Sequence, residues 1–288
     1  MVDLETRELE YFVAVAEELH FGRAAVRLSI AQPALSKAIQ RIETRLGVPL
    51  LVRSSRHVSL TPAGDALLHH GRHALNAVSA AAQAARQAGD AHAHLRLVLK
   101  PGGDASLLSG ILAAYAERPG AHQVDILFGG ATDRGDYLRD GRADVALLYV
   151  PFDDLTGLAC ETLLTEERVA VLPRGHRLAQ RTGLRLADLQ HETMPRWKGL
   201  PGGWPGLESG NGPEVNDVPQ LIPMIVLGRT IAMLPRSLIE PVPAELVCVP
   251  VTDAPPNHLV IAWSQLNRRP LVTSFVEAAV SARQGTRR

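Results

Sequence analysis

The sequence predicts a small helical unit followed by a larger α/β domain. Three observations indicate this division. At 288 residues the chain is long for a single hydrophobic core, so two domains are expected. Apolar residues recur at helical spacing through the first 46 positions. From Leu95 onward, short apolar runs of strand type alternate with helical stretches, which is typical of α/β folds with largely parallel sheets.

Three short helices are predicted in the helical unit. The first follows the i, i+3, i+4, i+7 apolar spacing from Leu9 to Ala16, and we expect it to break at His20, Phe21 and Gly22. A second short helix carries the small and apolar residues of 24–28 and ends in the turn "LSIAQP".

The third predicted helix has Pro33 in its first turn, where the missing N–H of proline costs nothing. Gly47 and Pro49 end it, because glycine closes helices and proline does not continue them. Its buried stripe consists of Leu35, Ile39, Ile42 and Leu46. Polar residues occupy the other side, namely Gln32, Ser36, Lys37, Gln40 and Arg41.

A basic hairpin and a long helix are expected next. Two strand-like pieces, "LLVR" and "HVSL", flank a tip that contains Arg56. Thr61 offers an N-cap, with Pro62 at the first helical position, for a helix that runs to about Gly89. Its Leu and Ala residues lie seven apart, as in a coiled coil. This helix either associates with another copy, which we favour, or packs on its own domain. The segment "GDAHAH" (89–94) is the predicted linker.

In the α/β domain, the predicted strands are "LRLVLK", "QVDILFG", "ADVALLYV", "RVAVLP", "TIAMLP" and "HLVIAW". The predicted helices are 107–117, 132–140, 218–228 and 270–283. The Pro/Gly-rich stretch 197–214 must be a loop.

Several classes of protein and site receive no support from the sequence. With two cysteines, Cys160 and Cys248, a disulfide framework is not indicated, and we expect two buried thiols. The amino terminus is not of signal-peptide type and no apolar run is long enough for a membrane span, so we expect a cytoplasmic protein without a membrane partner. A metal at His69 and His73 is a remote alternative to a solvated or interhelical role. No hydrolase elbow, phosphate loop or zinc-protease motif occurs, and we expect neither a catalytic residue nor a cofactor. A catalytic or solute-binding α/β protein is the competing class. Such a protein would need a signal peptide or a catalytic constellation, and the sequence shows neither.

The distribution of charge is informative although the net charge of the chain is zero. Between His20 and Leu60, seven basic residues stand against one glutamate, a net charge of +6, whereas the first nineteen residues carry −5. The second and third predicted helices are joined by a tight turn, and the third is basic on its open side. Such a pair predicts a helix-turn-helix, whose recognition helix enters the major groove. Gln32 can pair with adenine, and Ser36 can bond bases or phosphates. Lys37, Arg41, Arg53 and Arg56 can neutralise phosphates. A solvated helix face is the alternative.

The run 9–18, "LEYFVAVAEE", and the run 20–64, "HFGRAAVRLSIAQPALSKAIQRIETRLGVPLLVRSSRHVSLTPAG", resemble the winged helix-turn-helix of LysR-type transcriptional regulators. The segments "EERVAVLPRGHRLA" and "VLGRTIAMLPRSL" extend the resemblance to the second part. The resemblance implies a DNA-binding domain (1–61), a linker and dimerisation helix (62–90) and an effector-binding domain (91–288). Subdomain I of the latter covers about 91–165 and 267–288, and subdomain II about 166–266.

The family further implies a homotetramer, a dimer of dimers, on an interrupted inverted repeat of double-stranded DNA, and RNA polymerase as a partner if the protein activates. Carried onto this chain, the DNA-reading positions are Gln32, Pro33, Ser36 and Lys37, with Arg53 in the wing. Ala31 stands at a helix cap where the family often has serine.

A small-molecule effector is expected between the two subdomains, at loops where strands end and helices begin. Free N–H groups at such helix starts favour an anion. The loops are "KPGG" (100–103), "GGAT" (129–132) and "PRW" (195–197). Lys100 either points into the cleft or lies in solvent, and Asp104 either adds charge there or caps the next helix. Trp197 and Trp204 either stack on the effector or cover the surface. The candidate contacts are Lys100, Gly102, Gly103, Gly130, Thr132, Arg196 and Trp197.

Overall fold

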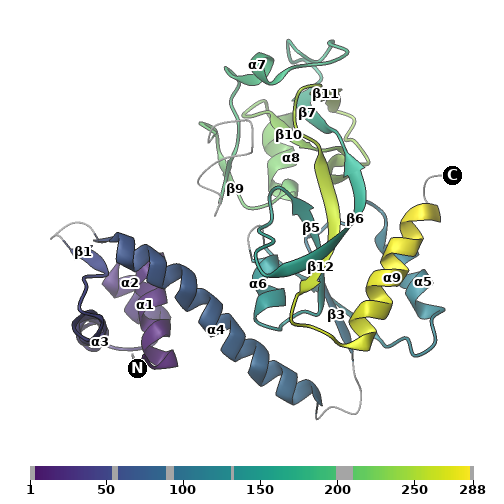
Figure 1. Cartoon of the computed structure of the whole chain (residues 1–288). Helices are drawn as coiled ribbons and strands as arrows, with labels where there is room; N and C mark the ends of the chain where they lie inside the picture. Colours follow the sequence, from purple (N-terminus) through teal and green to yellow (C-terminus); the bar gives the residue numbers. More distant parts are fainter. Residues whose placement is uncertain (1–3, 54–57, 89–93, 131–132, 199–209, 286–288) are drawn as a thin grey trace. The chain divides into compact units, whose positions relative to one another are not determined.

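The computed structural model describes residues 4–53, 58–88, 94–130, 133–198 and 210–285 (Figure 1). The chain divides into two compact units, residues 1–86 and 87–288. We describe each unit by itself.

The N-terminal unit consists of three helices, a short hairpin and one long helix (Figure 1). These elements are α1 (Thr6–Glu18), α2 (Phe21–Arg27), α3 (Gln32–Leu46), β1 (Leu51–Arg53), β2 (Val58–Leu60) and α4 (Pro62–Ala88). Its core consists of side chains from all three short helices, and Phe12, Leu35 and Ile42 are completely buried in it. The periodicity of the sequence therefore predicts the helices of this unit correctly.

The break between α1 and α2 is shorter than expected. Leu19 adopts a left-handed conformation (φ 45°) and ends α1. His20 caps α2, because its Nδ1 accepts hydrogen bonds from the backbone N–H groups of Gly22 (3.1 Å) and Arg23 (3.2 Å). Phe21 and Gly22, which were expected to belong to the break, form the first turn of α2 instead.

The α3 helix and the hairpin are held together by side chains at their junction. No side-chain cap is present at Ala31, and Gly47 (φ 71°) ends α3. Glu43 accepts hydrogen bonds from the backbone N–H groups of Leu50 (2.9 Å) and Leu51 (3.1 Å), which fixes the first strand to α3. The two strands pair antiparallel.

The long helix α4 begins as predicted. The Thr61 hydroxyl accepts a hydrogen bond from the N–H of Gly64 (3.0 Å) and so caps the helix. Gly64 lies so close to the Leu50 carbonyl that a Cβ would come within 2.1 Å of that oxygen. Farther along, the helix turns apolar residues to solvent, and 52% of the surface of Val78 is exposed. Among the described residues, the core cluster of this unit includes no side chain from the second half of α4.

The C-terminal unit contains two main sheets. The five-stranded sheet has the order β4-β3-β5-β12-β6, and the three-stranded sheet has the order β10-β7-β11. The strands of the first are β3 (Leu95–Leu99), β4 (Val124–Phe128), β5 (Val145–Val150), β6 (Leu158–Glu166) and β12 (Asn257–Ser264). Those of the second are β7 (Arg168–Pro173), β10 (Ala232–Pro235) and β11 (Leu246–Pro250).

The expectation of largely parallel sheets is only half right. In the five-stranded sheet β3 is parallel to β4 and β5, but β12 is antiparallel to β5 and β6. In the three-stranded sheet β7 is antiparallel to both of its neighbours. Since β12 belongs to the first sheet, the chain returns to that sheet by residue 257, not at 267 as predicted.

Helices cover these sheets and two short strands pair beside them. They are α5 (Leu108–Ala116), α6 (Arg134–Arg139), α7 (Leu186–Leu189), β8 (Arg196–Trp197), β9 (Glu214–Val215), α8 (Val218–Val226), the 3-10 helix η1 (Arg236–Ile239) and α9 (Pro270–Gly285). The α5 and α9 helices pack against each other, with the rings of Tyr115 and Phe275 edge to face at 5.0 Å (Figure 1). A buried cluster joins these helices to both sheets.

Both thiols are free, and neither is fully buried as expected. Cys160 on β6 is exposed and Cys248 on β11 is half-buried. Among the helices whose residues the structure describes, none combines the length and the apolar character needed to cross a membrane.

Candidate nucleic-acid interface and ligand cavity

The α3 helix turns its polar side to solvent. Gln32, Pro33, Lys37 and Arg41 are exposed and Ser36 is partly buried. The opposite side carries the buried stripe of the unit. Five sequence-predicted candidates therefore lie on one accessible side of one helix.

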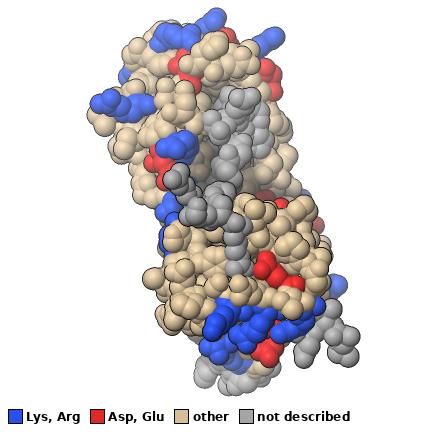
Figure 2. Space-filling view, turned by 90° about the vertical axis from the view of Figure 1, so that its left-hand side faces the viewer, with Lys and Arg blue, Asp and Glu red and all other residues tan. Residues whose placement is uncertain are grey.

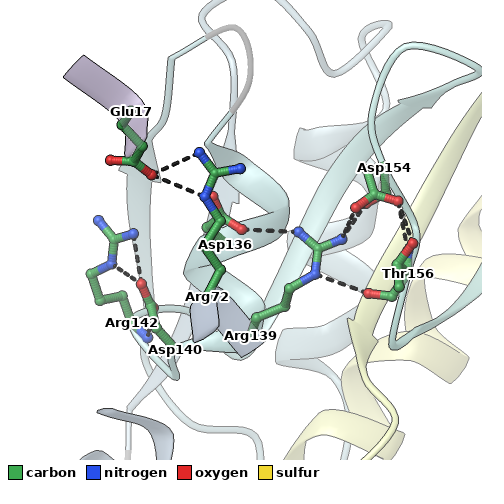
Figure 3. Close-up of polar contacts among 8 residues, drawn as sticks. All are labelled: Glu17, Arg72, Asp136, Arg139, Asp140, Arg142, Asp154 and Thr156. Carbon is green, nitrogen blue, oxygen red and sulfur yellow. Dashed lines mark hydrogen bonds and ion pairs between the residues drawn. The ribbon is translucent and has the colours of Figure 1, made fainter. Parts of the chain in front are cut away.

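The acidic first helix neutralises several of the basic residues that the sequence groups together. Arg27 pairs with Glu17 (2.6 Å), and Arg72 of α4 pairs with the same carboxylate (2.8 Å; Figure 3). The remaining pairs are Arg23–Glu18 (3.2 Å) and Arg45–Glu8 (2.7 Å). The Arg45 pair is bidentate and lowers the pKa of Glu8. These arginines therefore stabilise the unit.

Lys37 and Arg41 differ from these arginines, because neither forms an ion pair in the part of the chain that the structure describes. Both are exposed on α3. Figure 2 shows lysine and arginine side chains gathered in a band on the face of the N-terminal unit that this view presents. Two exposed cations on the polar side of α3 that form no ion pair among the described residues are suited to a polyanion.

Of the two candidate DNA contacts in the hairpin, Arg53 and Arg56, the structure describes only the first. Arg53 ends β1, opposite Val58. Arg56 lies outside the described residues.

The C-terminal unit contains a cavity of about 630 Å³, within the usual size range of small-molecule sites. Residues of both sheets and of the loops between them line it. They are Lys100, Pro101, Phe128, Gly129, Gly130, Arg134, Tyr149, Phe152, Asp153, Trp197, Lys198, Asn216, Asp217, Val218, Leu234 and Leu238.

Three of the seven predicted effector contacts, Lys100, Gly130 and Trp197, line this cavity. Arg196 does not line it, since it is exposed and donates from Nε to the Gly212 carbonyl (3.1 Å). Thr132 and Trp204 lie outside the described residues.

Gly102 and Gly103 do not line the cavity either, and both shape the loop that follows β3. Gly102 is exposed and has a left-handed conformation (φ 66°). A Cβ on Gly103 would come within 2.3 Å of the Lys100 Cγ. Gly103 therefore makes room for the stem of Lys100.

Lys100 is the polar centre of the cavity. Its Nζ lies 4.8 Å from the centroid of the Tyr149 ring, a cation–π geometry. Burial, followed by the positive charge of Arg134, lowers the pKa of Lys100 from 10.5 to about 7, whereas Asp153 and Glu166 oppose that change. Of the two alternatives left open by the sequence, the geometry places Lys100 at the cavity and not in bulk solvent.

A buried ion pair lies beside Lys100, and the sequence did not reveal it. Arg134 Nη2 contacts Asp153 Oδ1 at 2.7 Å, and Arg134 also donates to the Gly130 carbonyl. The second carboxylate oxygen of Asp153 accepts from the N–H of Tyr149 (2.7 Å). Burial raises the pKa of Asp153 although Arg134 lowers it. The sequence feature that came nearest to indicating this pair was the position of Arg134, four residues after the predicted effector contact Gly130.

A second arginine fixes α6 from its far end. Arg139 contacts Asp136 (3.0 Å) and Asp154 (2.8 Å) and donates to the Thr156 carbonyl (2.9 Å; Figure 3). Since Arg134 begins α6, this network also holds the wall of the cavity.

Hydrogen bonds join the two sheets next to the cavity. The Tyr149 hydroxyl lies 3.0 Å from the Ser237 hydroxyl, which donates to Glu166 (2.7 Å). At the same crossover Arg168 donates to Asn257 (3.1 Å) and lies over the ring of Phe152, with 5.0 Å from Cζ to the centroid. Burial raises the pKa of Tyr149. Because the Ser237 hydroxyl already donates to Glu166, the Tyr149 hydroxyl is the donor in its bond to Ser237.

The histidine cluster on α4 consists of rings in mutual contact. The centroids of His69 and His73 are 4.7 Å apart and the rings meet edge to face. Over the described ranges of the chain, no group of three or more His, Cys, Asp or Glu side chains has the arrangement of a metal site.

Comparisons with known proteins match both units. The family model described as "Bacterial regulatory helix-turn-helix protein, lysR family" matches residues 6–65, and "LysR substrate binding domain" matches residues 88–284. The transcriptional regulator AlsR of Bacillus subtilis (strain 168) is 30% identical, with 95% of this chain and 94% of that protein covered. The Hca operon transcriptional activator HcaR of Escherichia coli (strain K12) is 28% identical, with 95% and 96% covered.

Solved structures agree over nearly the whole chain. Full-length BenM is 25% identical, with a TM-score of 0.56 and coverage of 98% of this chain and 97% of that one. Full-length CbnR in complex with its target DNA has a TM-score of 0.53 at 22% identity, covering 97% of this chain and 99% of that one, which supports the fold.

Proposed function

Because this chain belongs to the LysR family of transcriptional regulators, we propose which of its residues bind operator DNA and which bind the effector. The protein is a DNA-binding transcriptional regulator with an effector-binding domain, and its family is one of regulators and not of enzymes.

We propose that α3 is the recognition helix. Gln32 and Ser36 at its N-terminal end contact base edges, with Pro33 beside them, since the first turns of a recognition helix reach the bases. Lys37 and Arg41 contact phosphates, together with Arg53 and Arg56 of the wing. The observation that supports this assignment is the pair of exposed cations on α3 that form no ion pair among the described residues.

The proposed assembly is a dimer of dimers on an interrupted inverted repeat. The exposed apolar and alanine residues in the second half of α4, Val78 among them, support pairing of this helix with a second copy. RNA polymerase is a further partner if the protein activates transcription.

We also propose that the cavity around Lys100 binds the effector. Its lining comes from both sheets, so a bound molecule contacts both subdomains and stabilises one arrangement of them over another. Its size and mostly apolar lining support a small molecule.

The test begins with selection of the purified protein against a random duplex library, followed by binding measurements at several salt concentrations. We expect enrichment of an inverted repeat and a steep loss of affinity with salt. Gln32→Ala should cost about 1–3 kcal/mol on the selected site and relax the preference at one base. Arg53→Ala should instead weaken binding to selected and random duplexes alike. Equal losses for Gln32→Ala on both duplexes would contradict its role as a base reader.

A further inference from the structure

The turn between the first two helices of the N-terminal unit brings a histidine ring beside the proposed recognition helix. We propose that His20 is a further DNA-contacting residue, whose Nε2–H group donates a hydrogen bond to a backbone phosphate next to the base that Gln32 reads. This inference rests on the proposed role of α3 and adds a contact from outside that helix.

The ring of His20 has one nitrogen that serves the fold and one that is open to a partner. Its Nδ1 accepts hydrogen bonds from the backbone N–H groups of Gly22 (3.1 Å) and Arg23 (3.2 Å). Because an acceptor nitrogen carries no hydrogen, the neutral ring holds its proton on Nε2. The side chain is exposed, and Nε2 forms no hydrogen bond with any residue in the described ranges. The ring therefore presents one N–H donor at the surface.

Gly22 leaves the space in which this ring lies. It belongs to the first turn of α2, and its φ is not positive, so the backbone does not require glycine there. Glycine in a helix is less stable than alanine. A Cβ at Gly22 would lie 3.0 Å from Cε1 and 3.3 Å from Nδ1 of His20, so an alanine would displace the imidazole. Room for the ring, and not backbone conformation, is what the glycine provides.

The same space adjoins the recognition helix. Oε1 of Gln32 lies 3.8 Å from the position of the absent Gly22 Cβ, so the Gln32 amide and the His20 ring both lie within 4 Å of that point. Gln32 is the first residue of α3 and is exposed. In a helix-turn-helix, the recognition helix reaches the bases with its N-terminal residues while the preceding helix crosses the DNA backbone. A donor at the start of α2 beside Gln32 is therefore placed for a phosphate at the edge of the groove.

This contact differs in kind from the proposed contacts of Lys37 and Arg41. A neutral imidazole donates a hydrogen bond to a phosphate but does not replace a counterion, whereas a lysine or an arginine does. Phosphate contacts also carry no direct sequence information. Loss of the imidazole should therefore weaken binding to selected and random duplexes alike and leave the slope of log K against log salt unchanged.

The experiment compares two substitutions of nearly equal size in the full-length protein. Asparagine and aspartate are both good helix N-caps, so His20→Asn and His20→Asp keep α2 capped and both remove the imidazole. Only the aspartate variant adds a negative charge. Fluorescence anisotropy at about pH 8, where imidazole side chains are uncharged, measures affinity for the selected duplex. We expect His20→Asn to weaken binding at least about tenfold, through the lost bond to a charged group. His20→Asp should weaken it about tenfold more, because a carboxylate repels the phosphate.

Two further variants separate a contact with DNA from a structural role. Asn76→Asp adds the same charge in the second half of α4 and should change affinity less than about threefold, since salt screens distant charges. Gly22→Ala should weaken binding in the wild-type background and have no further effect in the His20→Asn background, because the ring that it displaces is already absent. Denaturant unfolding of each variant measures any change in the stability of the fold.

Three results overturn the proposal. If His20→Asn binds as wild type does, or if both substitutions of His20 cause the same loss, the imidazole does not face a phosphate. If His20→Asn lowers the salt slope, the ring does not bind as a neutral donor. In these cases α3 remains the recognition helix provided that Gln32→Ala relaxes the preference at one base. If neither His20→Asn nor Gln32→Ala changes binding, both the further contact and the proposed recognition helix are contradicted.

Discussion

Salt dependence of DNA binding should separate the cations of α3 that contact phosphate from those that hold the fold. Lys37, Arg41 and Arg45 all lie on this helix. Arg45 is bound to Glu8 through two hydrogen bonds, of 2.7 and 3.0 Å, whereas Lys37 and Arg41 are exposed and form no ion pair in the described structure. Lys37→Ala and Arg41→Ala are therefore the perturbations, and Arg45→Ala is the matched control.

The magnitude follows from counterion release. Each phosphate contact contributes about 0.9 to the slope of log K against log salt. If two copies of α3 bind one inverted repeat, a single substitution removes two contacts and lowers the slope by about 1.8. Over a fourfold rise in salt, wild type then loses about twelvefold more affinity than the Lys37→Ala or Arg41→Ala variant.

The assay is fluorescence anisotropy of the selected duplex, titrated with each variant between about 50 and 200 mM salt, the range over which such contacts are resolved. Circular dichroism of each variant checks the helical content. Arg45→Ala should keep the wild-type slope, and its effect should appear as a loss of stability of at most about 1 kcal/mol, since the pair is partly exposed.

Two outcomes would refute this reasoning. An unchanged slope for both Lys37→Ala and Arg41→Ala would place the phosphates elsewhere on the unit. A slope for Arg45→Ala that falls as much as theirs would show that the ion pair to Glu8 opens on DNA, so that the free structure does not identify the DNA-binding cations.

Three further predictions concern the fold and the assembly. Arg45 lowers the pKa of Glu8, so ionised Glu8 stabilises the fold at pH values above its unfolded-state pKa near 4.5. This stabilisation is lost as the pH falls through the lowered pKa. In denaturant unfolding, the stability of Glu8→Gln should therefore depend less on pH in this range than that of wild type. Gly64→Ala would place a Cβ 2.1 Å from the Leu50 carbonyl oxygen and should cost about 1–3 kcal/mol of unfolding free energy. In the control Gly110→Ala the new Cβ meets no atom within 4 Å, so this variant should not be destabilised. Thermal melts in which the two variants behave alike would contradict this. Val78→Glu should shift sedimentation toward smaller species without loss of helix signal, and an unchanged distribution would argue against pairing through α4.

The helices could be predicted because their signal is local. In α1 and α3 the buried residues recur at the helical period, and Thr61 and Gly47 mark ends that the structure confirms. The strand β6 was missed because its sequence, "LACETLLTE", has two buried positions among nine and no apolar run. The sequence predicted largely parallel strands and missed the antiparallel orientation of β12. This strand pairs with β5 and β6, which lie about a hundred residues earlier in the chain, so no local pattern reveals the pairing.

The charges of the N-terminal unit show a second limit. The sequence indicates a basic segment of net +6 after an acidic one of −5, but a count cannot tell which charges meet. The Glu8–Arg45 pair spans 37 residues and the Glu17–Arg72 pair spans 55. The folded unit shows that Arg45, the third basic residue of α3, is paired with Glu8, whereas Lys37 and Arg41 form no ion pair among the described residues.

The cavity shows why a binding site is harder to predict than the fold that carries it. Lys100 was a candidate because it follows a strand, which is a local property. Asp153, whose charge acts on Lys100, comes from the loop after β5, and Leu234 comes from the other sheet, so no spacing in the sequence relates them. The chemistry of Lys100 depends on those distant neighbours, because a lysine at a strand end in water would keep its ordinary pKa near 10.5 and its hydration.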